Sequence, residues 1–181
     1  MESSLTERAK TLEGNLDFEK AYPMLSFEEK VAVNAYTDNL YVNLNKMLRG
    51  FAFEPEHQKI LEDLGTIVFN ALNKILPKYK GRVFRGSNLT TEVLQEYIEC
   101  FKSNKFISHS FFTSTSKSFL IAEKFFSGNV FFAILSKNGL DVSSLSQYPK
   151  EEEILFNKDT NFKILSISAS SSVVQIVMEE S

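Results

Sequence analysis

The chain has 181 residues, 43% of them hydrophobic, and a formal net charge of −3. This length and apolar content predict a single folded domain over residues 1–181 with a sizeable core, and we expect it to be a monomer. The acidic balance argues against nucleic acid as a partner, because phosphate binding needs clustered Lys and Arg.

The sequence also lacks the marks of a membrane or metal protein. No apolar run reaches the roughly 18 residues of a membrane-spanning helix, and the N-terminus has no apolar signal-peptide core. Cys100 is the only cysteine, and His57 and His109 are the only histidines. We therefore expect no disulfide framework and no metal site. His109 is expected to be a packed or hydrogen-bonded strand residue rather than a catalytic one.

The first part of the chain, residues 1–78, is predicted to be a helical lobe. Ser26 and Glu29 have the spacing of a capping box and predict a helix start there. A second helical stretch is expected over 39–48. Apolar residues then recur at i, i+3 and i+4 from Ile60 to Ile75, which predicts a long amphipathic helix.

The second part, residues 79–181, is predicted to be rich in strands. A helical part followed by a strand-rich part indicates an α+β fold rather than alternating βαβ units. We expect strands over 82–87, 106–113, 129–135, 162–168 and 173–178, helices over 90–101 and 117–126, a hairpin-like turn at Lys137-Asn138-Gly139, and a Ser-rich loop over 140–150.

Three consecutive glutamates mark the end of that loop. Glu151, Glu152 and Glu153 follow a proline turn and lead into an apolar run. On a strand, Glu151 and Glu153 face the same side about 7 Å apart, and Glu152 faces the other. Two carboxylates can then serve one site. The alternative is solvated charge that protects a strand edge.

Two further motifs precede the glutamates. Arg85 is followed directly by Gly86, a pairing in which a guanidinium can bind a diphosphate and a ligand can approach the backbone closely. Ser114-Thr115-Ser116 places three hydroxyl residues at a strand end. Taken singly, each has an ordinary structural explanation: a surface ion pair for the arginine, and a strand end or helix cap for the hydroxyls.

Taken in order, the motifs resemble the R-S-E class of mono-ADP-ribosyltransferases, which includes bacterial toxins and effectors as well as animal ectoenzymes. The resemblance covers roughly residues 24–178. Besides the three motifs, it is carried by the local patterns around them, by the segments 25–29, 35–37 and 160–165, and by Asn45, Leu48 and Arg49.

The resemblance implies a fold and a set of roles. The fold is a helical lobe followed by two packed, mostly antiparallel sheets that form a cleft for NAD, which is the substrate. Glu153 stabilises the oxocarbenium-like transition state as the bond from nicotinamide to ribose breaks, and Ser114 holds Glu153. The implied NAD contacts are Arg85 at the phosphates, the Gly86 backbone, Thr115, and Phe125 stacked on nicotinamide.

Glu151 is implied to select the acceptor. Glutamate two residues before the catalytic glutamate goes with transfer to arginine, and a carboxylate binds a guanidinium through two hydrogen bonds. The partner is then a target protein with an arginine, and Tyr148 is a candidate contact to it. We expect a secreted or injected effector acting in a target-cell cytoplasm, or a cytosolic enzyme. The alternatives are an NAD glycohydrolase and a non-catalytic NAD-binding module.

Overall fold

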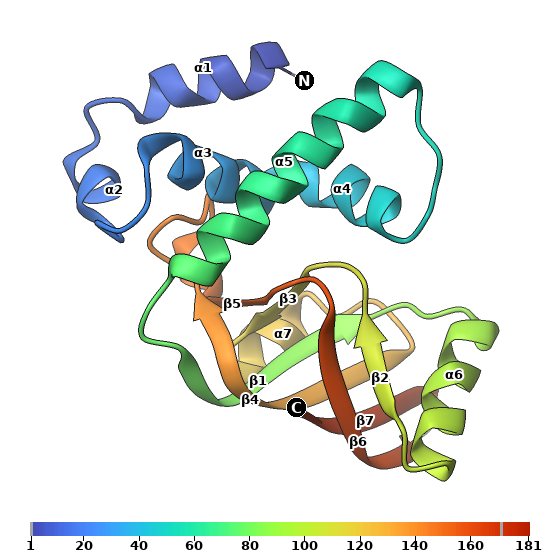
Figure 1. Cartoon of the computed structure of the whole chain (residues 1–181). Helices are drawn as coiled ribbons and strands as arrows, with labels where there is room; N and C mark the ends of the chain where they lie inside the picture. Colours follow the sequence, from blue (N-terminus) through green and yellow to red (C-terminus); the bar gives the residue numbers. More distant parts are fainter. Residues whose placement is uncertain (1, 171) are drawn as a thin grey trace.

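The computed structural model of the protein describes residues 2–170 and 172–181. Its helices α1 to α5 form a lobe that lies against one end of a β-sheet, and α6 and α7 pack on the sheet (Figure 1). The helical lobe comprises α1 (Glu2–Leu12), α2 (Leu16–Lys20), α3 (Phe27–Ala35), the π-helical turn η1 (Tyr36–Leu40), α4 (Tyr41–Leu48) and α5 (Pro55–Lys74).

The predicted capping box begins α3. The amide of Glu29 donates to Ser26 Oγ at 3.2 Å, and the amide of Ser26 donates to Glu29 Oε2 at 2.9 Å. Two of the amides that a helix start leaves unpaired are thereby satisfied. The second helical stretch does not begin as a separate element near residue 39, because η1 joins α3 directly to α4.

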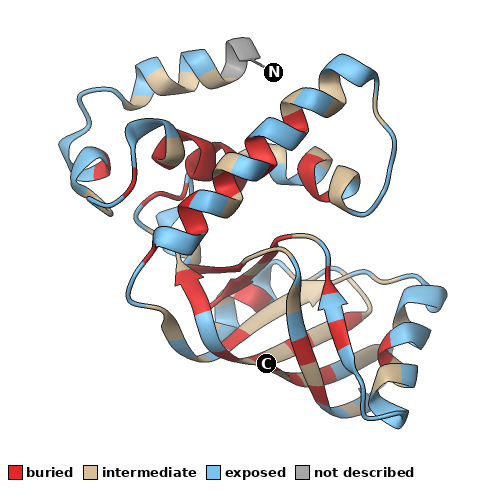
Figure 2. Ribbon diagram, viewed as in Figure 1, coloured by how far each residue is buried: buried red, intermediate tan, exposed pale blue. Residues whose placement is uncertain are grey.

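The long helix α5 carries the apolar face that the sequence predicts. Its buried residues lie along one side of the helix and face α3 and α4 (Figure 2). Gly65 allows the close approach of α4, since an added Cβ would lie 3.1 Å from Leu44 Cδ1. Each fully buried leucine stabilises this packing by about 1.5–3 kcal/mol relative to an exposed one.

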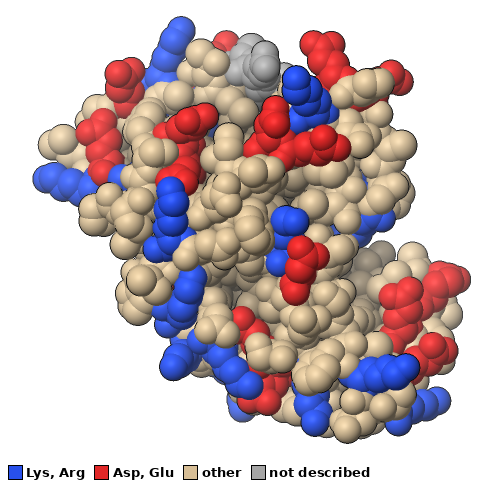
Figure 3. All heavy atoms as spheres, viewed as in Figure 1, with Lys and Arg blue, Asp and Glu red and all other residues tan. Residues whose placement is uncertain are grey.

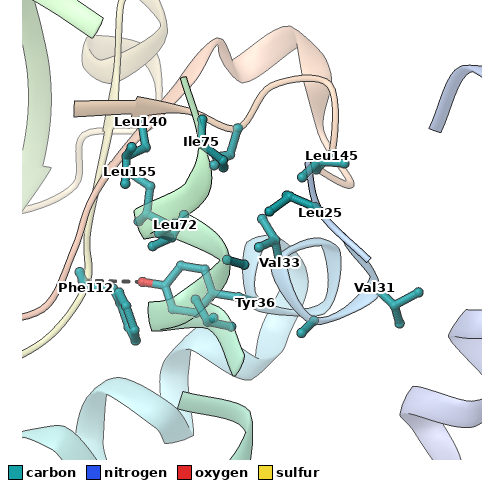
Figure 4. Packing of buried hydrophobic residues seen from close by; sticks show 14 of the residues in the cluster. Leu25, Val31, Val33, Tyr36, Leu72, Ile75, Phe112, Leu140, Leu145 and Leu155 are labelled. Atoms are coloured by element: carbon teal, nitrogen blue, oxygen red, sulfur yellow. Dashed lines mark hydrogen bonds between the residues drawn. The ribbon is translucent and has the colours of Figure 1, made fainter. Parts of the chain in front are cut away.

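The same core reaches into the strand-rich half. Tyr36 and Leu72 of the helical lobe pack with Phe112, Leu140 and Leu155 in one buried cluster (Figure 4). The Tyr36 hydroxyl donates to the Phe112 carbonyl oxygen at 3.3 Å. The helical lobe is therefore held to the sheet by a shared apolar core as well as by the connecting chain.

In the described part of the chain, seven strands form the sheet in the order β1-β3-β5-β4-β7-β6-β2, and β1 also pairs with β4. The β4–β7 pairing is parallel and the others are antiparallel. The elements are β1 (Tyr79–Ser87), α6 (Thr91–Lys102), β2 (Phe106–His109), β3 (Thr113–Ser116), α7 (Phe119–Lys124), β4 (Val130–Asp141), β5 (Glu153–Phe156), β6 (Thr160–Ser170) and β7 (Val173–Glu180).

This arrangement confirms the α+β fold with mostly antiparallel strands. The two expected sheets are instead joined by hydrogen bonds into one sheet, through the long strand β4 and through β1. The first part of β4 pairs with β1 and β7, and its end pairs with β5 through Leu140 and Asp141. β1 likewise pairs with both β3 and β4, so β1 and β4 together connect the two sheets that the resemblance implies.

Two predicted local features are wrong. The chain does not reverse at Lys137-Asn138-Gly139, because β4 continues through it. The amides of Lys137 and Asn138 both donate to Glu180 Oε2 at 2.7 Å, so a side chain from β7 satisfies them there. The predicted strand over 106–113 is also divided into β2 and β3. The backbone of Phe112, between the two, is bonded to the helical lobe through Asn45.

The surface combines both signs of charge. Lys and Arg are interspersed with Asp and Glu over the face in Figure 3. Among residues 2–170 and 172–181, no helix has the length and apolar character needed to cross a membrane.

Candidate active site

A cleft of about 470 Å³ lies between the helical lobe and the sheet. Its walls come from η1 and α4 on one side, and from β1, β3, α7 and the chain around β5 on the other. The residues that the sequence predicts for the site all line this cleft: Arg85, Gly86, Ser114, Thr115, Phe125, Glu151 and Glu153. The fold therefore brings together motifs that lie far apart in the sequence.

Arg85 lies half-buried on β1, with its guanidinium directed to β3. Its Nη1 donates to the Ser114 carbonyl oxygen at 2.8 Å. Gly86 follows, and a Cβ at this position would lie 2.4 Å from Cδ2 of Phe126. The glycine is therefore required by the close packing of the Phe126 ring, in addition to any approach of a ligand.

The hydroxyl residues of β3 make separate contacts because successive side chains point to opposite faces. The Ser114 side chain faces the cleft and donates a hydrogen bond to the Glu153 carboxylate. Thr115 Oγ1 donates to the Ile154 carbonyl oxygen at 2.7 Å, which joins β3 to β5 by a side chain as well as by the backbone.

The glutamates do not lie on one strand, and this prediction is wrong. Glu151 ends the 3₁₀ turn η2 (Pro149–Glu151), and Glu152 has the left-handed backbone angles φ 49° and ψ 48°. Only Glu153 belongs to β5. The turn nevertheless brings Glu151 and Glu153 to the same cleft and leaves Glu152 exposed. Ser116 Oγ fixes the turn by donating to the Glu151 carbonyl oxygen at 2.8 Å.

Burial sets the charge state of the two cleft carboxyls. Desolvation raises the pKa of Glu153, which is 5% exposed, to about 7. The Ser114 hydrogen bond and the Arg85 charge oppose this rise, whereas the neighbouring Glu151 charge adds to it. Desolvation also raises the pKa of Glu151. Perturbed carboxyl groups of this kind, paired in a cleft, are typical of functional sites.

The helical lobe contributes residues that the sequence analysis did not assign to the site. Asn45 is buried, and its Nδ2 donates to the Tyr36 hydroxyl and to the Phe112 carbonyl oxygen, each at 3.1 Å. Asn45 Oδ1 accepts from the Phe112 amide at 3.2 Å. A polar residue on the buried face of a predicted helix is the sequence signal that points to such a role.

Arg49 is the second such residue. It ends α4 at the cleft, and its guanidinium lies 3.7 Å from the centroid of the Phe111 ring. Burial and the nearby Arg85 charge lower the pKa of Arg49. Two guanidinium groups that repel each other beside a cleft form a favourable place for an anion.

Comparison with known proteins identifies the family. The family model described as NAD:arginine ADP-ribosyltransferase matches residues 2–181. The chain belongs to this family. The Mav protein of Mycobacterium avium is 36% identical over 156 residues, which make up 86% of this chain but 18% of Mav. The chain thus spans less than a fifth of that relative.

Solved structures agree with this ADP-ribosyltransferase fold. HopU1 of Pseudomonas syringae has a TM-score of 0.84 at 22% identity, covering 98% of this chain and 87% of HopU1. The Vis toxin of Vibrio splendidus, in complex with agmatine, has a TM-score of 0.77 at 25% identity. That alignment covers 100% of this chain and 86% of Vis.

In the described part of this ADP-ribosyltransferase domain, Phe125 is the phenylalanine after Ser116 that lines the cleft. It is 63% exposed at the end of α7. Phe119 instead packs edge-on against Phe84, with ring centroids 5.5 Å apart, and Phe126 covers Gly86. Of these three rings, Phe125 is therefore the one in the cleft wall, and its stacking on nicotinamide stays a prediction.

A second cavity, of about 670 Å³, adjoins the cleft and shares Arg49 and Arg85 with it. His109 lies in its wall, where its ring nitrogens are 2.7 Å from the Tyr97 hydroxyl and 2.8 Å from Thr113 Oγ1. Burial lowers the pKa of His109 to about 3, so the ring is neutral. His109 is a packed, hydrogen-bonded histidine, as expected from the sequence.

Proposed function

We propose that this domain transfers ADP-ribose from NAD to an arginine side chain of a target protein and releases nicotinamide. The observation that carries the proposal is the pair of carboxylates, Glu151 and Glu153, opening on one cleft beside Arg85. Membership of the NAD:arginine ADP-ribosyltransferase family supports the same reaction.

The two adjoining cavities suit a dinucleotide. NAD consists of two nucleotides joined by a diphosphate, and Arg49 and Arg85 lie where the cleft meets the second cavity. Guanidinium groups bind phosphate oxygens through paired hydrogen bonds. The nicotinamide end then lies in the cleft with Gly86 and Thr115 in its wall and Phe125 placed to stack on the ring, and the adenosine end lies in the second cavity.

Glu153 acts where the bond breaks. The bond from nicotinamide to ribose breaks with its electron pair leaving on nicotinamide, which develops positive charge on the ribose. The Glu153 carboxylate, held by the Ser114 hydroxyl, accepts a hydrogen bond from a ribose hydroxyl and stabilises that charge. Its pKa of about 7 means that Glu153 must lose its proton before the reaction.

Glu151 acts on the acceptor. Its carboxylate binds the incoming guanidinium and orients one nitrogen toward the ribose carbon. A new carbon–nitrogen bond forms there, and the guanidinium nitrogen loses one proton. Burial raises the pKa of Glu151, which suits the carboxylate to accept that proton. Tyr148, 48% exposed beside this turn, is placed to contact the target protein.

Two substitutions test the proposal with agmatine as a small guanidine acceptor. Glu153→Ala should abolish nicotinamide release and transfer alike, because both need the charged transition state. Glu151→Ala should lose transfer while some NAD hydrolysis remains. Glu152→Ala is the matched control, since its side chain is exposed, and it should behave as wild type. Wild-type rates in both cleft variants would refute the assignment.

The partner and the setting belong to the same proposal. The acceptor is a protein with an accessible arginine, and the chain acts as a monomer. The name of the Vis toxin supports an effector that acts on a target cell. Among the described residues, no group of three or more His, Cys, Asp and Glu side chains is placed to hold a metal ion.

A further inference from the structure

Arg8 of α1 joins the first helix to the region of the cleft that takes the acceptor. Its Nη1 donates to Asn34 Oδ1 at 2.8 Å and to Gln147 Oε1 at 3.4 Å. Its Nη2 donates to the Asp38 carboxylate. The Arg8 and Asp38 side chains are 20% and 21% exposed, so this ion pair is largely shielded from water. Shielded, forked contacts hold geometry better than a surface pair.

The partners of Arg8 in turn hold the loop over 142–148. Asn34 Nδ2 donates to the Leu145 carbonyl oxygen at 2.7 Å in a buried contact. The Tyr148 hydroxyl donates to Asp38 Oδ1 at 3.3 Å. Both helical partners of Arg8 therefore bind the loop directly, and Gln147 is itself part of the loop.

The loop leads without interruption into Glu151. The amide of Glu151 donates to the Tyr148 carbonyl oxygen at 2.9 Å, which closes the 3₁₀ turn. Asp38 lies in η1, and π-helical turns are frequent at functional sites. A continuous series of contacts thus runs from Arg8 through Asp38 and Tyr148 to the turn that bears Glu151.

We propose that Arg8 is a positioning residue for the acceptor arginine. This inference rests on the proposed function. Arg8 holds Asn34, Asp38 and Gln147 in one arrangement, and that arrangement sets the position of Glu151 relative to the ribose. A lysine would not replace it fully, because an ammonium lacks the planar fork that matches several oxygens at fixed angles.

The test separates acceptor binding from NAD chemistry. Arg8→Met keeps much of the apolar stem and removes the guanidinium. We expect its KM for agmatine to rise about tenfold, because a small displacement of an orienting group is costly. KM for NAD and the rate of nicotinamide release without acceptor should stay at wild-type values. Arg8→Lys should restore part of the agmatine affinity.

Lys74→Met is the matched control. Lys74 pairs with Glu29 at 2.6 Å between α5 and α3, so this ion pair lies in the same lobe and joins two helices rather than a helix and the loop. It should leave both KM values unchanged. Hydrogen exchange should be faster over 142–148 in Arg8→Met and unchanged in Lys74→Met. If Arg8→Met fails to fold, Asp38→Asn removes the same ion pair and should raise the agmatine KM in the same direction.

Failure of this inference and failure of the proposed function give different results. A wild-type protein that releases nicotinamide but never modifies agmatine contradicts the proposed function. A wild-type protein that modifies agmatine, with Arg8→Met showing an unchanged agmatine KM, contradicts only the role of Arg8. An equal rise in the KM for agmatine and the KM for NAD, or the same rise in Lys74→Met, also contradicts the role of Arg8, because either result indicates general destabilisation.

Discussion

Replacing Glu153 with glutamine should stabilise the fold at neutral pH even as it removes activity. The carboxyl group is 5% exposed, and burial raises its pKa from 4.5 to about 7. Ionising it inside the protein is therefore costly. Glutamine has nearly the same shape, its amide oxygen can still accept the Ser114 hydrogen bond, and it carries no charge at any pH.

The sign and the size of this stability difference follow from the linkage between proton binding and folding. Between pH 4.5 and 7 the folded state keeps a proton that the unfolded chain releases, so the stability of wild type falls as pH rises through this range. By pH 7 the loss is about 3 kcal/mol. Glu153→Gln does not suffer this loss. For a chain of this size the difference corresponds to a melting temperature higher by about 6–12 °C.

The assay is thermal unfolding of both proteins across that pH range. The difference in melting temperature should be small near pH 4.5 and should grow toward pH 7. Glu152→Gln is the control, because the same change at an exposed neighbouring residue should give no pH-dependent difference. A gap between wild type and Glu153→Gln that stays constant with pH would show that burial does not perturb this carboxyl group.

Three further results are expected. kcat/KM for nicotinamide release should rise with pH and level off above about 7, because Glu153 must be ionised. Gly86→Ala should destabilise the protein by about 1–3 kcal/mol in urea unfolding, and Phe126→Ala in the same chain should make the combined loss smaller than the sum, because it removes the clash. Asn45→Ala should cost about 1–3 kcal/mol in the same assay, since the buried amide of Phe112 loses its partner and the Phe112 carbonyl oxygen keeps only the Tyr36 hydroxyl.

Each of these can fail in a defined way. A rate that is flat with pH would mean that Glu153 is already ionised in acid. Strictly additive losses for Gly86→Ala and Phe126→Ala would mean that the ring does not occupy the space beside the glycine. An Asn45→Ala protein as stable as wild type would mean that Phe112 finds other partners.

Local sequence predicted most of the helices and strands, and the motifs predicted part of the cleft lining. The Ser26 capping box and the apolar spacing of α5 depend on residues a few positions apart, so periodicity and turn chemistry predict them. The order of Arg85, Ser114 and Glu153 predicted which side chains share a cleft, through resemblance to a family. Their chemical roles stay predictions until the variants are measured.

Only the tertiary structure decided how the pieces meet. Asn45 divides a predicted strand by binding Phe112, 67 residues away. Glu180 binds the backbone of β4 at Lys137, 43 residues earlier in the sequence, where a turn was predicted. Periodicity holds no information about such distant partners.

The glutamates also show which features the sequence predicts and which only the tertiary structure decides. Their sequence indicated two carboxylates for one site, and both line the cleft although the predicted strand begins only at Glu153. The 3₁₀ turn and the left-handed Glu152, tied down by Ser116, bring Glu151 to the cleft. Arg8 is a further example, because its hydrogen bonds reach residues up to 139 positions away in the sequence and no local pattern marks it. Side chains that reach across the fold set the geometry of this cleft, and only packing reveals them.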